Sequence, residues 1–284
     1  MSATSPAAAP AFRGRIGRDV RSGHYAVPHR YRLHLSPPCP DSLRIAVTHS
    51  LLGLDDVLPV DLLPAVPDGP EGGFRALEAL YEASSHHHSG PAAAPALSDA
   101  WTGRIVSTHA PDILRDLALR FGAGGPDLYP YAMGERLDAV SALCVERIDD
   151  AAQTAGRLGI AGAAHEEPLG VLLDALGSVE RCLSSQEYVL GDGPTAADVQ
   201  LWVTLVQLDT VHRWHLDADA VDRIADHPSL WSYSRRLAAD PSFGAHLDLD
   251  AVARRHHARC RGHEAAGAAM QIVDWDACVG RTPL

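Results

Sequence analysis

Apolar and polar positions alternate in the first part of the chain and then recur at helical spacing. Alternating apolar side chains predict a half-buried strand over residues 30–35. After a proline-rich turn, apolar residues three and four apart predict a helix over residues 43–54. Residues 57–63 predict a second strand, and Pro59 suggests that it lies at a sheet edge. Together these segments predict a β-α-β unit.

A segment of different composition separates this unit from the next elements. Residues 64–95 are rich in Pro, Gly, Ser and Ala, so we interpret them as a long irregular insertion of the kind that forms lids, with one short helix over residues 74–81. Residues 96–98 and 105–107 predict a β-hairpin, and residues 112–121 predict a helix.

The pattern beyond Pro130 is purely helical. Six helices are expected, over residues 133–154, 168–182, 196–208, 220–224, 228–238 and 249–259. Thr195 and Asp198 have the spacing of a capping box, in which side chains at the start of a helix satisfy unpaired backbone N–H groups. The helix that follows them is apolar on nearly all sides and is therefore expected to be buried.

These patterns predict two domains. We expect an α/β thioredoxin-like domain over residues 22–124, which includes the insertion 64–95, and an all-α domain over residues 125–262. Residues 1–21 are expected to be a disordered tail, because an Ala/Ser/Pro tract buries too little surface to offset its ordering entropy. Residues 263–284 form a C-terminal extension.

Charge and cysteine content limit the class of partner. The 24 basic residues are all Arg, against 36 acidic ones, for a net charge of −12, so a nucleic-acid or anionic-membrane surface is not expected. No stretch approaches the roughly 20 apolar residues of a membrane helix. Five cysteines without a Cys-x-x-Cys pair, and no N-terminal apolar segment, favour a reducing cytoplasm. The expected partners are small molecules.

Three features together resemble one known family. They are Cys39-Pro40 at a strand-to-helix turn, Ala94-Pro95 before a hairpin strand, and the capped helix of the all-α part. This combination resembles the glutathione transferase superfamily, and within it the Xi class, the glutathionyl-hydroquinone reductases. The resemblance extends over about residues 22–262. It implies the glutathione transferase fold and a homodimer.

The resemblance makes Cys39 the catalytic nucleophile. In the family, this cysteine attacks a glutathionylated hydroquinone and forms a mixed disulfide that a second glutathione resolves. The position itself favours a thiolate, because the N-terminus of a helix is the positive end of its dipole, and Pro40 costs no hydrogen bond at the first helical position. Asp41 replaces the tryptophan of the family motif and opposes ionisation, and Arg44 is placed to neutralise it.

The expected thiol-binding residues depart from the family in one place. The resemblance implies a cis peptide bond at Ala94-Pro95, which presents backbone groups to the cysteinyl part of the thiol. The family's Glu-Ser pair, which holds the γ-glutamyl group, is His109-Ala110 here, so glutathione binding is expected to be weakened. The thiol could be mycothiol, as the high-GC composition suggests. The expected thiol-binding residues are Pro40, Asp41, Ala94, Pro95 and His109.

The substrate-site tyrosines of the family are replaced as well. Gln153, His212 and His257 stand where the resemblance expects tyrosine. Unlike tyrosine, histidine titrates near neutrality, so His212 and His257 are candidate catalytic acids or bases. Trp214 and His256, with Gln153, are expected to bind a quinone-like aromatic or other electrophilic substrate.

Two other functional classes stay open at this point. One is a thiol-independent tailoring enzyme of aromatic natural products that uses the histidines His212 and His257. The other is a non-catalytic ligand-binding protein.

No metal is expected, although the chain contains two histidine clusters of a kind that can bind metals. His256, Cys260 and His263 lie along one face of a helix, and imidazole and thiolate are good ligands of zinc or copper. Structural zinc sites, however, usually recruit ligands from two segments, and arginines interleave with this set. His86–His88 lies in a polar segment and is expected to be solvated.

Overall fold

The computed structural model describes residues 12–122, 124–160, 166–260 and 270–280. The chain divides into two compact units, Met1–Gly125 and Pro126–Leu284. None of the helices in the described part of the chain has the length and apolarity that a membrane crossing requires.

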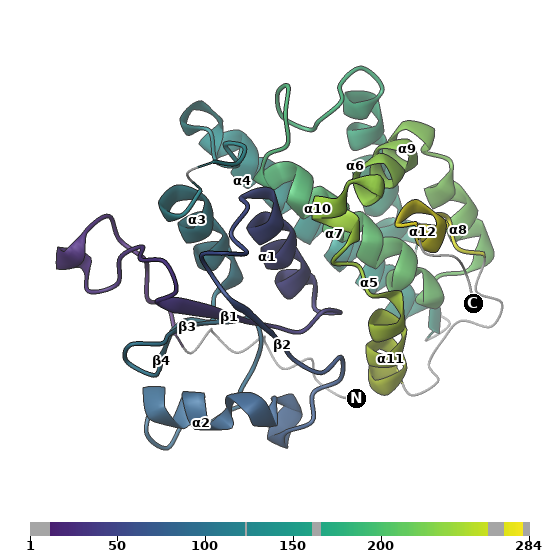
Figure 1. Cartoon of the computed structure of the whole chain (residues 1–284). Helices are drawn as coiled ribbons and strands as arrows, with labels where there is room; N and C mark the ends of the chain where they lie inside the picture. The colour runs from purple at the N-terminus through teal and green to yellow at the C-terminus, as the bar shows by residue number, and fades with distance from the viewer. Residues whose placement is uncertain (1–11, 123, 161–165, 261–269, 281–284) are drawn as a thin grey trace. The chain divides into compact units, whose positions relative to one another are not determined.

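Unit 1 is built on a four-stranded mixed sheet in the order β2-β1-β3-β4. Its strands are β1 (Tyr31–Leu35), β2 (Val60–Leu62), β3 (Ala96–Asp99) and β4 (Arg104–Ser107). β1 pairs parallel to β2 and antiparallel to β3, and β3 pairs antiparallel to β4. On one face of the sheet lie α1 (Pro40–Leu51) and α3 (Ala110–Arg120), and α2 (Arg75–Ser84) lies on the other (Figure 1). This is the thioredoxin-like architecture that the alternation in β1 and the helical spacing after it predict.

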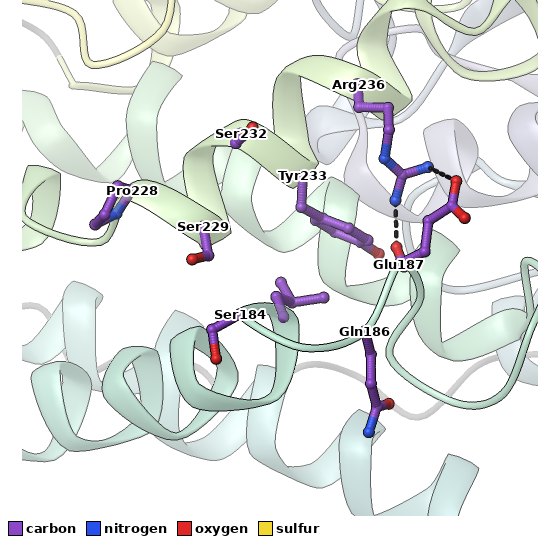
Figure 2. A pocket seen from close by; sticks show the side chains of 9 residues that line it. Ser184, Gln186, Glu187, Pro228, Ser229, Ser232, Tyr233 and Arg236 are labelled. Atoms are coloured by element: carbon purple, nitrogen blue, oxygen red, sulfur yellow. Dashed lines mark hydrogen bonds and ion pairs between the residues drawn. The ribbon is translucent and has the colours of Figure 1, made fainter.

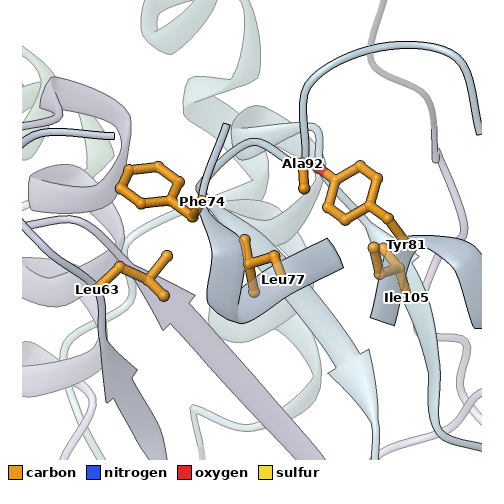
Figure 3. Packing of buried hydrophobic residues seen from close by; sticks show 6 residues of the cluster. All are labelled: Leu63, Phe74, Leu77, Tyr81, Ala92 and Ile105. Carbon is orange, nitrogen blue, oxygen red and sulfur yellow. The ribbon is translucent and has the colours of Figure 1, made fainter. Parts of the chain in front are cut away.

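The short helix expected over residues 74–81 is present as α2, but the interpretation of residues 64–95 as an irregular, lid-like insertion is wrong. The segment contains α2, and Phe74, Leu77 and Tyr81 are only 2%, 1% and 3% exposed. They pack with Leu63, Ala92 and Ile105 in one cluster against the sheet (Figure 3). The Tyr81 hydroxyl donates to the carbonyl of Ala93 at 2.8 Å, which ties the returning chain to the helix. The segment is therefore the second helical layer of unit 1. The turn-rich composition on both sides of α2 gave no indication of this packing.

Leu77→Ala tests this assignment. A leucine buried in a core cluster leaves a cavity when it is shortened, so we expect the free energy of unfolding to fall by about 2–3 kcal/mol. Urea unfolding measures the change. The exposed Leu62 of β2 is a matched control, since Leu62→Ala removes a side chain that is 73% exposed and should change stability by less than about 0.5 kcal/mol. Equal stability of Leu77→Ala and wild type would show that the segment is a loosely attached lid.

The expectation of a disordered tail over residues 1–21 is wrong for residues 12–21. Arg13 pairs with Ser107 in an isolated β-bridge, and the Gly14 N–H donates to the Val106 carbonyl at 2.8 Å. Ile16 is 1% exposed, and its N–H donates to Asp116 at 2.7 Å. The partners are about a hundred residues away, so local composition could not reveal them. The Ser2–Pro10 tract lies outside the described residues.

Unit 2 consists of helices throughout the described residues. They are α4 (Gly134–Ala142), the π-helical segment η4 (Leu143–Asp149), α5 (Asp150–Ile160), α6 (Glu166–Leu183), α7 (Ala196–Thr210), the 3-10 turn η5 (His212–His215), α8 (Ala218–Ala225), α9 (Pro228–Ala239), α10 (Pro241–Gly244), α11 (Leu249–Cys260) and α12 (Trp275–Cys278). The predicted helix over residues 133–154 is continuous but contains the π-helical segment. Unit 2 is thus the all-α part that the helical periodicity predicts.

Helix α7 forms the centre of unit 2. Its side chains from Ala197 to Asp209 are buried with the exception of Gln200, as the apolar pattern predicts. The capping box is present, and Thr195 donates its N–H to the carboxylate of Asp198 at 2.8 Å. At the other end, Asp209 accepts the indole N–H of Trp275 at 2.8 Å, so α7 also anchors part of the C-terminal extension.

Candidate functional site

Cys39 occupies the N-cap of α1, as the sequence predicts. Its carbonyl accepts the N–H of Leu43 at 2.8 Å, and Pro40 takes the first helical position, where a missing N–H costs nothing. The Cys39 residue is 9% exposed. Cys39 therefore lies at the positive dipole end of a 12-residue helix, and its side chain makes no capping hydrogen bond to the first turn.

The strand directions bring three predicted thiol-site elements to one end of the sheet. β1 and β4 both run antiparallel to β3, so the carboxyl ends of β1 and β4 meet the amino end of β3. Cys39 follows β1, the Ala94-Pro95 peptide precedes β3, and His109 follows β4. The Ala94-Pro95 bond is cis, as the resemblance implies. Three segments that are far apart in the sequence therefore reach the same edge of unit 1.

The acidic residue next to Cys39 is neutralised within its own helix. Arg44 Nη2 donates a short hydrogen bond to Asp41 Oδ1. The side chain of Arg44 is 14% exposed, whereas that of Asp41 is 45% exposed. The sequence places Arg44 where it can neutralise Asp41. The structure shows this ion pair, so the carboxylate next to Cys39 is compensated one turn along the helix.

His109 lies in a charged cluster rather than alone. Its Nδ1 atom is 2.8 Å from Asp112 Oδ2 and 3.1 Å from Arg13 Nη2. Arg15 reaches the other oxygen of Asp112 at 3.2 Å. At this position the resemblance implies a carboxylate that binds the γ-glutamyl ammonium. This chain has an imidazole and two guanidinium groups there instead. The carboxylate of Asp112 is already bound to these groups. Sequence reasoning found His109 but missed Arg13 and Arg15, because both come from the segment expected to be disordered.

This cluster should make the stability of unit 1 depend on acid pH. Burial raises the pKa of Asp112, but hydrogen bonds from Arg13 and His109 and the charge of Arg15 outweigh it and hold this pKa below its ordinary value of 3.8. Because the folded-state pKa is depressed, the contribution is present above pH 3.8 and is lost as the pH falls through the folded-state value. Asp112→Asn should therefore cost about 1 kcal/mol at pH 7.

Urea unfolding of wild type and Asp112→Asn at pH 7, 5 and 3 measures the difference. We expect the gap between the two proteins to persist at pH 5 and to shrink at pH 3. Asp222→Asn, on the exposed side of α8, is the matched control and should match wild type at each pH. A gap that stays constant down to pH 3 would show that the charge of Asp112 contributes nothing.

In unit 2, the structure brings His212, Trp214 and His256 together. His212 and Trp214 belong to η5, and the ring of His256, on α11, lies 6.4 Å from that of Trp214. Burial, reinforced by the positive charges of His215 and His256, lowers the pKa of His212 to about 4. His212 is therefore neutral at pH 7 and can accept a proton but not donate one as an imidazolium.

The other two residues of the predicted substrate site are exposed. Gln153 lies on α5 and His257 on α11, with the ring of His257 6.5 Å from that of His256. Sequence reasoning missed His215, whose Nε2 atom lies 3.3 Å from Cys260 Sγ. No local signal could have revealed it, since the two residues are 45 positions apart.

A surface hollow in unit 2 is unrelated to the predicted site. It lies between the end of α6 and α9, and the guanidinium of Arg236 contacts Glu187 at its rim (Figure 2). The same guanidinium lies 4.9 Å from the ring centroid of Tyr188. None of the catalytic, thiol-binding or substrate-binding residues predicted from the sequence lines this hollow.

Comparison with known proteins agrees with this architecture. The family described as glutathione S-transferase, C-terminal domain, matches residues 163–236. The chain is 27% identical over 264 residues to the glutathionyl-hydroquinone reductase YqjG of Escherichia coli, covering 87% of this chain and 80% of that protein. It is 28% identical over 253 residues to the glutathionyl-hydroquinone reductase PcpF of Sphingobium chlorophenolicum, covering 83% and 79%. These matches support the resemblance of the chain to the glutathione transferase superfamily.

Both reductases are of the type that the sequence resemblance named, which supports the resemblance to the Xi class of this superfamily. A solved Xi-class transferase from Natrialba magadii has the same fold, with a TM-score of 0.77 and 23% identity over 93% of this chain and 86% of that one. The cysteine at the start of α1 and the cis proline before β3, two of the features that carry the resemblance, are both present in the structure.

Proposed function

We propose that this protein is a thiol-dependent oxidoreductase that removes a low-molecular-weight thiol from a quinone-like aromatic substrate, with Cys39 as its nucleophile. The observation that carries the proposal is the placement of Cys39 at the N-cap of α1, at the same sheet end as the cis Ala94-Pro95 peptide. Relatives at 27% and 28% identity are named glutathionyl-hydroquinone reductases, which supports this reaction type.

The proposed reaction has two disulfide steps. In the first, the Cys39 thiolate attacks the sulfur of an aryl thioether, the carbon–sulfur bond breaks, and the aryl carbon takes a proton to give the free hydroquinone. In the second, a thiolate from solution attacks the mixed disulfide and restores Cys39, and its own sulfur leaves in a small-molecule disulfide. The hydroquinone is the reduced product, and two sulfur atoms, one from the thioether and one from the free thiol, are oxidised to the small-molecule disulfide. Each cycle begins and ends with reduced Cys39 at the positive dipole end of α1.

The thiol itself is the second part of the proposal. The γ-glutamyl ammonium of glutathione would meet Arg13 and His109 here, and Asp112 is already engaged by both. We therefore propose a cosubstrate without an ammonium group at this position, and mycothiol is the candidate. His109→Glu should then improve glutathione as cosubstrate, because it restores a carboxylate at that position.

Intact-protein mass tests the proposal. Wild type and Cys39→Ser are incubated with glutathione disulfide, with mycothiol disulfide and with a quinone, each at several pH values. We expect a single thiol adduct on wild type alone, formed faster with mycothiol disulfide than with glutathione disulfide. Faster reaction with glutathione would overturn the choice of thiol and leave the nucleophile in place.

If no adduct forms on wild type with any of these reagents, the nucleophile assignment is wrong. Turnover of an aromatic substrate without added thiol would then identify the thiol-independent tailoring enzyme, with His212 as the next target. Binding without turnover would identify the ligand-binding protein. A homodimer belongs to the same proposal, and the molecular mass in solution tests it.

A further inference from the structure

We propose that His215, His256 and Cys260 form a binding site in unit 2 for one divalent cation of the zinc type. One imidazole comes from η5, and the other imidazole and the thiol come from α11. Structural zinc sites usually recruit ligands from two segments, and the α11 residues alone do not meet this criterion. With His215 from η5, the site does. The proposal does not depend on the thiol-dependent reaction proposed above, since all three ligands belong to unit 2 and the evidence for them is their own geometry, although His256 is also an expected substrate-binding residue.

The spacing of the three donor atoms fits one metal ion. Cys260 Sγ lies 3.3 Å from His215 Nε2 and 3.5 Å from His256 Nδ1. With zinc–sulfur and zinc–nitrogen bonds of about 2.3 and 2.0–2.1 Å, a tetrahedral angle places sulfur and nitrogen about 3.5 Å apart. All three donor atoms lie within 4.8 Å of one another. A cation can therefore reach all three with little movement of the protein.

The surrounding helices hold the donors in place. His256 is 5% exposed, and its ring centroid lies 5.1 Å from that of His215 and 6.4 Å from that of Trp214. Behind His215, α5 approaches so closely that a Cβ atom on Gly156 would lie 2.7 Å from His215 Cβ. A rigid support of this kind is what fixes the geometry of metal ligands.

The donor types select the class of cation. Two imidazoles and one thiolate suit zinc, or copper, and disfavour magnesium or calcium, which prefer oxygen. The thiolate offsets one of the two positive charges, and three protein ligands leave the fourth position to water or a small molecule. The second cluster with suitable spacing in the described part of the chain, Glu82, His86 and His87, is fully exposed and contains no sulfur. The sulfur therefore distinguishes the two sites.

Cobalt(II) and zinc(II) titrations of the full-length protein test the proposal. After chelator treatment and dialysis, Co²⁺ should bind wild type with one equivalent and produce a thiolate-to-cobalt charge-transfer band, which Zn²⁺ then removes. We expect Cys260→Ser to lose this band and His256→Gln to bind Co²⁺ at least about 100-fold more weakly. Cys182→Ser, another partly exposed thiol of unit 2, and the double variant His86→Ala with His87→Ala should match wild type.

A further readout needs no variant. Zn²⁺ should slow alkylation of Cys260 by iodoacetamide in wild type at least about 10-fold, as located by peptide mass, and leave Cys182 unaffected. The proposal is overturned if wild type shows no charge-transfer band, if the band persists in Cys260→Ser, or if Zn²⁺ leaves Cys260 alkylation unchanged. Loss of binding in the His86/His87 variant alone would assign the metal to the exposed cluster and likewise overturn it.

Discussion

Cys39→Ser is expected to lower thiol-dependent turnover of a glutathionylated or mycothiolated hydroquinone by about 1,000-fold or more. A serine hydroxyl is not ionised at neutral pH and cannot form the mixed disulfide, so the first proposed step loses its nucleophile and the second step loses its substrate. The N-cap of α1 should tolerate the change, because serine is a preferred residue at this position. The effect should therefore appear in turnover and not in folding.

Steady-state kinetics of the variant, with urea unfolding beside them, measure both quantities. Cys182→Ser is the matched control, since it removes a partly exposed thiol from α6 and should leave turnover and stability unchanged. If Cys39→Ser kept more than about a tenth of wild-type turnover with the same thiol, another residue would have to carry the chemistry.

The fold was predictable wherever one side of an element is buried. Tyr31, Leu33 and Leu35 are at most 1% exposed and alternate with more exposed residues, so β1 shows its period in the sequence. Helix α7 is also evident, because apolar residues fill nearly every position from Val199 to Val206, a pattern typical of a buried helix. The helix over residues 74–81 was predictable, but its packing in the core was not, because turn residues surround it and its partners Leu63 and Ile105 lie outside the segment.

The candidate site was predictable where local sequence sets the geometry. Cys39-Pro40 at the start of a helix and the cis Ala94-Pro95 bond are both short-range features, and both are present. Arg13 beside His109 and His215 beside Cys260 depend on chain segments 96 and 45 residues apart. Such pairs follow from packing, which no periodicity or motif spacing encodes.

Asp198→Ala is expected to reduce the free energy of unfolding by about 4 kcal/mol, the largest effect on stability that we predict. The residue is 0% exposed, and its carboxylate accepts hydrogen bonds from the N–H groups of Val189 and Thr195. It also accepts the hydroxyl of Tyr233 at 3.0 Å. Removal of the carboxylate leaves several buried donors without an acceptor, and each costs its full desolvation.

Tyr233→Phe removes the hydrogen bond that the tyrosine hydroxyl donates to Asp198. Burial, together with the negative charge of Asp198, raises the pKa of Tyr233 well above 10, so its hydroxyl remains a donor at every pH at which the protein folds. Phenylalanine removes this one bond and leaves the backbone bonds to Asp198 intact, so it should cost only about 1 kcal/mol. Urea unfolding of Asp198→Ala and Tyr233→Phe measures how much free energy of unfolding each variant loses. Equal losses would show that the tyrosine bond, and not the capping of α7, accounts for the stability that Asp198 provides.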